Sequence, residues 1–139
     1  MITAVDTNVL VDVLSADTVF GERSREAVAS CALAGQLVAS DVVWAELGSA
    51  FREGERAIEA LDTLEVAFSA TERASAELAG RAWRAYRAAG GGARTRLVAD
   101  FLIGAHASAQ ADRLLTRDRG FYRAYFTDLE IVDPTAAPG

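Results

Sequence analysis

Four acidic residues of this 139-residue chain stand where carboxylates could do chemistry. Asp6 directly follows one short apolar run and Asp118 lies two residues past another, so both are predicted to lie near strand ends. Glu46 and Asp100 lie inside apolar segments, where a lone charge is costly to bury. Every residue from 97 to 103 except Asp100 is apolar, which indicates that this carboxylate does not face open water.

Four carboxylates that converge on one point would repel one another strongly. A divalent ion removes this repulsion, and a set of oxygen-only ligands selects magnesium or manganese over zinc. Such an ion suits the hydrolysis of a phosphodiester, because it activates water and neutralises charge in the transition state. We therefore expect a Mg²⁺ site, at which Mn²⁺ could substitute.

The net charge of the chain argues at first against a nucleic-acid substrate. It is −6, from 14 basic and 20 acidic residues, and an acidic chain is not an obvious nucleic-acid binder. All the basic residues are arginine, and any one of them alone would more often be a solvated surface charge. Local potential governs phosphate contact more than net charge does. We therefore predict a substrate-binding set close to the acids, made of Arg94, Arg96, Arg117 and Arg119.

The absence of lysine excludes three other classes of acidic site. Receiver domains and haloacid-dehalogenase-type phosphatases use an essential lysine, and a P-loop NTPase needs a Gly-Lys pair. The triple glycine at 90–92 is not a dinucleotide fingerprint, because no predicted strand precedes it. The single cysteine, Cys31, is interpreted as a buried, inert thiol. His106 lies six residues after Asp100, about 240° round a helix, so we expect it to point elsewhere.

The elements that must position these residues alternate between short strands and helices. Strands are predicted at 2–5, 36–39, 64–68, 113–116 and 129–132. A first helix is predicted after Asp6 with Thr7 or Asn8 as its cap, and a third after a Ser40 or Asp41 cap, ending near 54. The other helices are predicted at 21–34, 56–61, 71–89, 96–109 and 118–125. This order predicts an α/β domain with a mostly parallel sheet, whose ligands gather at the carboxyl ends of the strands.

A single domain is expected at 1–133, with 134–139 as a flexible C-terminal tail. No stretch approaches the roughly 20 apolar residues of a membrane helix, and the start does not resemble a signal peptide, so we expect a cytoplasmic protein. Trp83 and Tyr86 are predicted to pack in the core or in a dimer. The apolar side of their helix is predicted to carry Ala74, Leu78, Ala82, Ala85 and Ala89.

Four segments resemble, in order, the acidic motifs of the PIN domain family. They are Val-Asp-Thr-Asn-Val-Leu at 5–10, Trp-Ala-Glu-Leu at 44–47, Ala-Asp-Phe-Leu-Ile-Gly-Ala-His-Ala at 99–107 and Leu-Thr-Arg-Asp-Arg-Gly-Phe at 115–121. Each motif alone is weak, but the ordered set spans nearly the whole chain. In size, the chain most resembles the VapC-type toxins of type II toxin–antitoxin pairs.

This resemblance implies a three-layer α/β/α PIN-like domain with a four- to five-stranded sheet. It implies a Mg²⁺-dependent endoribonuclease that forms a homodimer and is inhibited by a cognate antitoxin, which would cover an apolar groove near 9–34 and 43–61. By the same resemblance, Thr116 would steady the site through hydrogen bonds and Asn8 would brace the first loop. The residues expected to bind metal or orient metal-bound water are Asp6, Glu46, Asp100 and Asp118.

Two alternatives remain open at this stage. One is a non-catalytic PIN-like module that binds RNA or a protein, although the intact acidic set argues against it. The other is a DNA-directed nuclease of the same fold. The sequence also leaves open which RNA would be cut and whether one or two metal ions bind.

Overall fold

The computed structural model describes residues 1–91 and 98–136. Its sheet has five strands in the order β3-β2-β1-β4-β5, and every neighbouring pair is parallel. The prediction of a mostly parallel sheet of four to five strands is confirmed. The strands are β1 (Ile2–Val5), β2 (Gln36–Ser40), β3 (Val66–Ser69), β4 (Arg113–Leu115) and β5 (Glu130–Val132).

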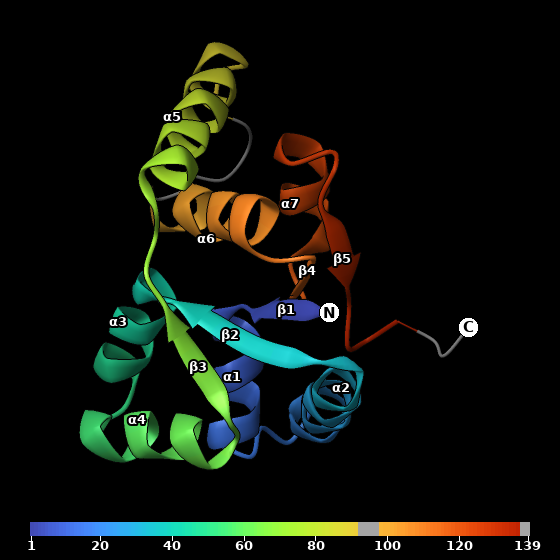
Figure 1. Ribbon diagram of the computed structural model, residues 1–139. Helices are drawn as coiled ribbons and strands as arrows, with labels where there is room; N and C mark the ends of the chain where they lie inside the picture. The colour runs from blue at the N-terminus through green and yellow to red at the C-terminus, as the bar shows by residue number, and fades with distance from the viewer. Residues whose placement is uncertain (92–97, 137–139) are drawn as a thin grey trace.

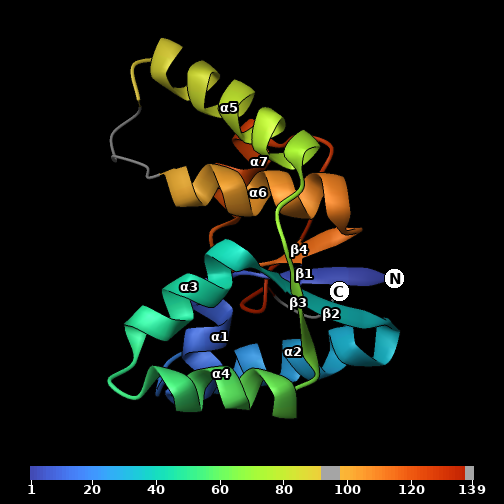
Figure 2. The same ribbon diagram turned by 60° about the vertical axis from the view of Figure 1, so that its left-hand side comes forward.

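Helices cover both faces of the sheet, which confirms the three-layer α/β/α architecture. Figures 1 and 2 show α1, α2 and α4 on one face and α5, α6 and α7 on the other, with α3 beside one end of the sheet. None of the described helices is long and apolar enough to cross a membrane. The helices are α1 (Thr7–Leu14), α2 (Gly21–Ala34), α3 (Asp41–Ala50), α4 (Gly54–Thr63), α5 (Arg73–Ala88), α6 (Val98–Gln110) and α7 (Arg119–Tyr125).

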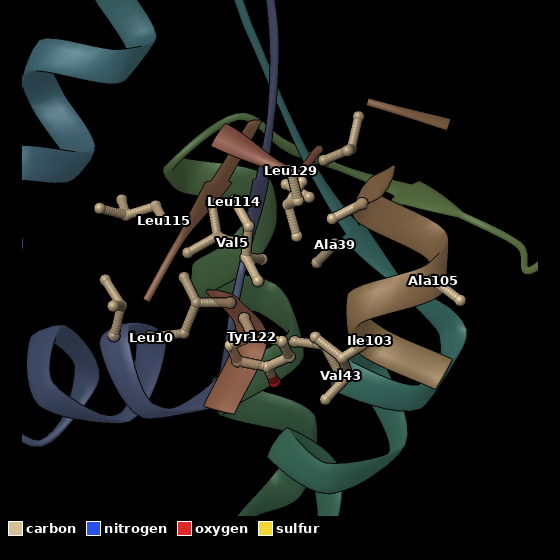
Figure 3. Packing of buried hydrophobic residues seen from close by; sticks show 14 of the residues in the cluster. Val5, Leu10, Ala39, Val43, Ile103, Ala105, Leu114, Leu115, Tyr122 and Leu129 are labelled. Carbon is tan, nitrogen blue, oxygen red and sulfur yellow. The ribbon is translucent and has the colours of Figure 1, made fainter. Parts of the chain in front are cut away.

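The central strand β1 and its neighbour β4 both contribute to the core. Val5 of β1 and Leu114 and Leu115 of β4 are buried, as expected for strands that helices cover on both sides. Figure 3 shows these side chains in one cluster with residues of the flanking helices, among them Leu10 of α1 and Tyr122 of α7. The candidate site lies where the β1–β4 pair ends.

The predicted boundary between the third and fourth helices is wrong. Helix α3 ends at Ala50, and Gly54 begins α4 rather than closing α3. A side chain at Gly54 would collide with the backbone oxygen of Gly48, so glycine here allows a close helix–helix approach. The sequence predicts that the third helix ends near this glycine, because sequence alone does not show the close packing.

The predicted apolar side of α5 is also partly wrong. Ala74 and Ala85 are exposed, as is Ala89 just after the helix, whereas the buried side consists of Ser75, Ala79, Ala82 and Tyr86. Alanine occurs on both the buried and the exposed sides of this helix, so the alanine positions do not identify the buried side. Tyr86 is buried against Phe101, which confirms the core interpretation of that aromatic residue, and half-buried Trp83 stacks on the same ring.

The strand register brings two distant segments together at one end of the sheet. Val5 pairs with Leu115, so Asp6 and Thr116, which follow them, lie side by side. The backbone amide of Asp6 continues the pairing by donating to the Leu115 carbonyl at 2.9 Å. The chain order also reverses here, since β1 has β2 on one side and β4 on the other. Ligands of open parallel sheets bind at such a reversal, outside the carboxyl ends of the strands.

Candidate active site

Asp6 is a buried carboxylate held by four donors. The residue as a whole is only 4% exposed. Oδ1 accepts from the Thr7 backbone amide at 2.7 Å, and Oδ2 accepts from the hydroxyls of Thr116 at 2.8 Å and Tyr122 at 3.1 Å. A longer contact of 3.5 Å joins Oδ2 to Asn8 Nδ2. Asp6 also caps α1, so the prediction that Thr7 or Asn8 is the cap is wrong.

Burial raises the pKa of Asp6 to about 6, despite these hydrogen bonds. Hydrogen bonds from Thr116, Thr7 and Tyr122 act in the opposite direction and lower the pKa, while the charge of Glu46 raises it further. The ionised form is therefore only partly compensated by the protein. A cation at this position would supply the missing compensation.

All four predicted acids line one cavity of about 350 Å³. Asp6 and Asp118 reach it from the ends of β1 and β4, while Glu46 and Asp100 reach it from α3 and α6. The last three acids are half-buried, and Glu46 Oε1 accepts from the Thr7 hydroxyl at 2.7 Å. The structure thus brings together four residues that are spread over 113 positions between 6 and 118.

Thr116 is the centre of the hydrogen bonds that link β1 to β4. Its buried hydroxyl donates to Asp6 and accepts from the Asp118 backbone amide at 3.0 Å and from Asn8 Nδ2 at 3.3 Å. Asn8 Oδ1 in turn accepts from the Arg117 backbone amide at 3.3 Å. Both residues thereby connect the first loop to the loop that carries Asp118.

The predicted substrate-binding arginines differ in their surroundings. Arg94 and Arg96 lie outside the described residues. Arg119 has a side chain that is 55% exposed, with Nε 3.6 Å from Asp133. Arg117 lines the cavity, but its guanidinium also pairs with Asp12, a partner that sequence reasoning missed.

The donor set at the cavity fits a hard divalent cation. It consists of carboxylate, hydroxyl and amide oxygens, which Mg²⁺ prefers over the softer ligands of zinc. Among the described residues, no three acidic, histidine or cysteine side chains are arranged to hold one ion together. The arrangement therefore fits an ion that takes one or two carboxylates and keeps several waters, which is the usual binding mode of Mg²⁺.

Two hydroxyl residues of the site were missed from sequence. Tyr122 was visible only as part of the predicted 118–125 helix, and Thr7 was considered only as a helix cap. Both donate to predicted metal ligands, and the pKa of Tyr122 is raised well above its ordinary value by burial and by nearby carboxylates. Helix α7 also contains Arg119 and Arg123, so the hydroxyl of Tyr122 is no distinctive signal in the sequence.

Two residues interpreted as non-catalytic lie outside the cavity lining. His106 is 1% exposed, and its Nε2 lies 2.8 Å from Ser69 Oγ. Cys31 is buried, and burial raises the pKa of its thiol, as expected for an inert cysteine. Neither residue lines the acidic cavity, which agrees with the interpretation from the sequence.

Comparison with known proteins identifies the family. No curated protein matches the chain. The structure is similar to VapBC2 from Rickettsia felis bound to a DNA fragment from their promoter, with TM-score 0.75 and 20% identity over 96% of this chain and 98% of that chain. It is also similar to VapBC-1 from nontypeable Haemophilus influenzae, with TM-score 0.72 and 22% identity over 98% and 100% of the two chains.

A third similar structure is a toxin–antitoxin complex from Klebsiella pneumoniae, with TM-score 0.67 and 20% identity over 97% of this chain and 99% of that chain. At these sequence identities, the similarity of the structures shows that the chains share a fold. The sequence itself matches the PIN domain over residues 3–127, which include all four acids of the cavity. The chain therefore belongs to the PIN domain family.

Proposed function

We propose that this chain is a Mg²⁺-dependent endoribonuclease and the toxin of a toxin–antitoxin pair. The observation that carries the proposal is the convergence of four carboxylates on one cavity, at the point where the strand order reverses. Carboxylates with room for a divalent ion suit the hydrolysis of phosphodiesters. Membership of the PIN domain family supports the same chemistry.

In this proposal each acidic residue of the cavity has a separate role in binding the metal ion or in orienting water. Bound Mg²⁺ would activate water and neutralise charge in the transition state. Asp6 would hold the ion. Hydrogen bonds from Thr116, Tyr122 and the Thr7 amide fix the orientation of its carboxylate. Glu46, with one oxygen on the Thr7 hydroxyl, would use its other oxygen to orient water.

The antitoxin part of the proposal draws on the similar structures and on a second cavity. VapBC2, VapBC-1 and the Klebsiella complex share the fold. A cavity of about 230 Å³ lies between the end of α1 and the α3–α4 connection, within the region expected to receive an antitoxin. Its lining is Leu14, Phe51, Arg52, Glu53, Arg56, Ala57 and Ala60. This mixture of apolar and charged groups suits an amphipathic segment of a partner protein.

A homodimer is also part of the proposal. Phe68 on the edge strand β3 is 56% exposed and packs edge-on against Trp44, with ring centroids 5.3 Å apart. Aromatic side chains are enriched at protein interfaces. This observation supports a self-association surface on the β3 side, which light scattering of the purified chain would test.

Cleavage assays test the nuclease proposal directly. Single-stranded RNA and DNA are incubated with the chain, with Mg²⁺ or with EDTA, and the products are resolved by length. We expect RNA cleavage that needs Mg²⁺ and that Asp100→Asn abolishes, while circular dichroism shows the variant folded. The matched control is Asp128→Asn, because Asp128 is exposed and does not line the cavity.

Each alternative has its own outcome in this assay. Cleavage of DNA in preference to RNA would indicate a DNA-directed nuclease of the same fold. Binding of RNA without cleavage would indicate a non-catalytic module. Full activity of Asp100→Asn, or full activity in EDTA, would contradict the proposed mechanism.

A further inference from the structure

Asp12 and Arg117 form a partly buried ion pair beside the acidic cavity. Arg117 Nε lies 2.7 Å from Asp12 Oδ2, and Nη2 lies 3.1 Å from Oδ1, so the guanidinium and carboxylate meet along two parallel contacts. The side chain of Asp12 is 4% exposed and that of Arg117 is 28% exposed. Paired contacts of this kind fix the plane of a guanidinium, which a single contact does not.

Two further residues hold the pair in place from α2 and the loop before it. The Ser24 hydroxyl donates to Asp12 Oδ2 at 2.8 Å. The ring of Phe20 lies against the guanidinium, with Arg117 Cζ 4.1 Å from the ring centroid. A cation over an aromatic face is stabilised by the ring quadrupole. Arg117 is therefore enclosed on one edge by a carboxylate and on one face by a ring.

The position of Arg117 connects this pair to the candidate site. Arg117 stands between Thr116 and Asp118 in the chain and lines the same cavity as the four carboxylates. Its third nitrogen, Nη1, makes no hydrogen bond to any residue within 1–91 or 98–136. One edge of the guanidinium thus remains for a ligand of the cavity.

We propose that Asp12, with Phe20, is a positioning residue that holds Arg117 so that its remaining edge binds an RNA phosphate. This inference rests on the proposed function for the identity of the ligand. Arginine donors in a fixed plane match the geometry of phosphate oxygens. Ordering Arg117 before RNA arrives removes part of the entropy cost of forming that contact.

Charge alone predicts the opposite effect for Asp12, and this makes the inference testable. A carboxylate beside a phosphate-binding site repels the phosphate, so its removal should strengthen RNA binding. If Asp12 instead acts through the orientation of Arg117, its removal should weaken binding. The sign of the change therefore separates the two roles.

The experiment measures the binding of a short fluorescent single-stranded RNA by anisotropy, in the presence of Mg²⁺. All variants carry Asp100→Asn, so that binding is measured without cleavage. We expect Arg117→Gln to weaken binding about 5- to 10-fold and to reduce the slope of log K against log salt by about 0.7, the value for one phosphate contact on a single strand. Asp12→Asn should weaken binding about 3- to 5-fold.

Two comparisons complete the design. Glu22→Gln removes one negative charge from an exposed position on α2 and should leave binding unchanged or slightly stronger. The double variant Asp12→Asn/Arg117→Gln should bind no more weakly than Arg117→Gln alone, because both changes remove the same contact. If Asp12 only supports the fold, Asp12→Asn should lower the melting temperature but leave the RNA affinity of the folded protein and its salt slope unchanged.

Several results would overturn the inference. One is a folded Asp12→Asn variant that binds RNA as tightly as its parent or more tightly. If Asp12→Asn does not fold, Phe20→Leu replaces it, with an expected weakening of about 2- to 3-fold, and unchanged binding overturns the inference.

The proposed nuclease function can fail separately. If the unmodified chain does not cleave RNA but Asp12→Asn still weakens binding relative to Glu22→Gln, the positioning role stands and the nuclease proposal fails. If the chain does not bind RNA at all, both fail.

Discussion

Two polar clusters lie at the carboxyl end of the same sheet and differ in how their charges are compensated. At the ends of β1 and β4, four carboxylates line a cavity, and burial raises the pKa of Asp6 to about 6. At the ends of β2 and β3, polar groups pair with one another. His106 meets Ser69, and Asp41 accepts from both the hydroxyl and the amide of Thr71.

The pKa values of one carboxylate from each cluster, Asp6 and Asp41, shift in opposite directions. Burial alone would raise the pKa of Asp41, but hydrogen bonds from Thr71 and nearby backbone amides outweigh it and lower the pKa. In Asp6 burial dominates. The protein thus stabilises the charge of Asp41 more fully than that of Asp6, and strongly perturbed carboxylates cluster at functional sites. Proximity to strand ends is therefore not sufficient to identify the active site.

The largest expected effect separates the two clusters by activity. Asp6→Asn should reduce RNA cleavage more than about 100-fold, because loss of a metal-binding or charge-stabilising group typically costs two to three orders of magnitude in rate. Ser69→Ala, its counterpart in the other cluster, should leave the cleavage rate within about 2-fold. Initial rates at saturating RNA measure both. A large loss of activity in folded Ser69→Ala would contradict the assignment of that cluster as structural.

The second effect concerns stability and involves Gln110 of α6, which bonds to the segment that follows β3. Gln110 Oε1 accepts from the Glu72 amide at 3.0 Å and from the Ser75 hydroxyl at 2.6 Å, and its amide donates to the Ala70 carbonyl at 2.9 Å. Gln110→Leu should cost about 2 kcal/mol of unfolding free energy, since it removes three hydrogen bonds.

Urea denaturation measures this loss for Gln110→Leu. The matched control is Gln36→Leu, because Gln36 is an exposed glutamine at the start of β2. Cleavage per folded molecule should remain unchanged in both variants. Equal stability of the two variants would show that the Gln110 bonds contribute little.

Three of the four acids of the candidate site can be predicted from local features of the sequence. Asp6 and Asp118 were found because each follows a short apolar run, and Asp100 because its whole segment is apolar. These are local features, which a single sequence displays directly. The strands were predicted within about two residues at each end for the same reason.

Long-range partners could not be predicted in this way. Tyr122 reaches Asp6 across 116 positions, and Arg117 reaches Asp12 across 105. Such contacts depend on strand register and helix packing, which no local pattern specifies. The buried side of α5 differs from the prediction for a related reason. Its alanines lie on both the buried and the exposed sides, and the buried side includes Ser75, whose hydroxyl bonds to Gln110 of α6.

A smaller effect tests how far Asp6 depends on the hydroxyls around it. Tyr122→Phe removes one donor to Asp6 Oδ2 while keeping the buried ring. We expect a loss of about 1 kcal/mol of unfolding free energy, the usual net value of one hydrogen bond, and a several-fold decrease in cleavage. Tyr125→Phe is the matched control, because Tyr125 packs on Phe101 and Phe121 outside the cavity lining. Equal activity of the two variants would show that Tyr122 does not orient Asp6.

The smallest expected effect is a pH dependence that belongs to the structural cluster. Burial lowers the pKa of His106 below its ordinary value of 6.5, although the charges of Asp41 and Glu72 act in the opposite direction. As the pH falls through about 6.5, the unfolded chain takes up a proton that the folded chain does not. His106 therefore contributes stability that is present above this pH and is lost as the pH falls towards its folded pKa.

Replacing the single histidine isolates this contribution. The free energy of unfolding of the wild type should fall relative to that of His106→Gln as the pH falls from 7.5 to 5.5. This difference between the two free energies can change by at most about 1.4 kcal/mol per pH unit, which is the limit for one proton. Urea denaturation at three pH values measures it. Carboxylates that do not act on His106, among them Asp6, cancel in the difference because both proteins contain them. Parallel pH curves would show that His106 has an ordinary pKa, and the contrast between the two clusters would then rest on the carboxylates Asp6 and Asp41 alone.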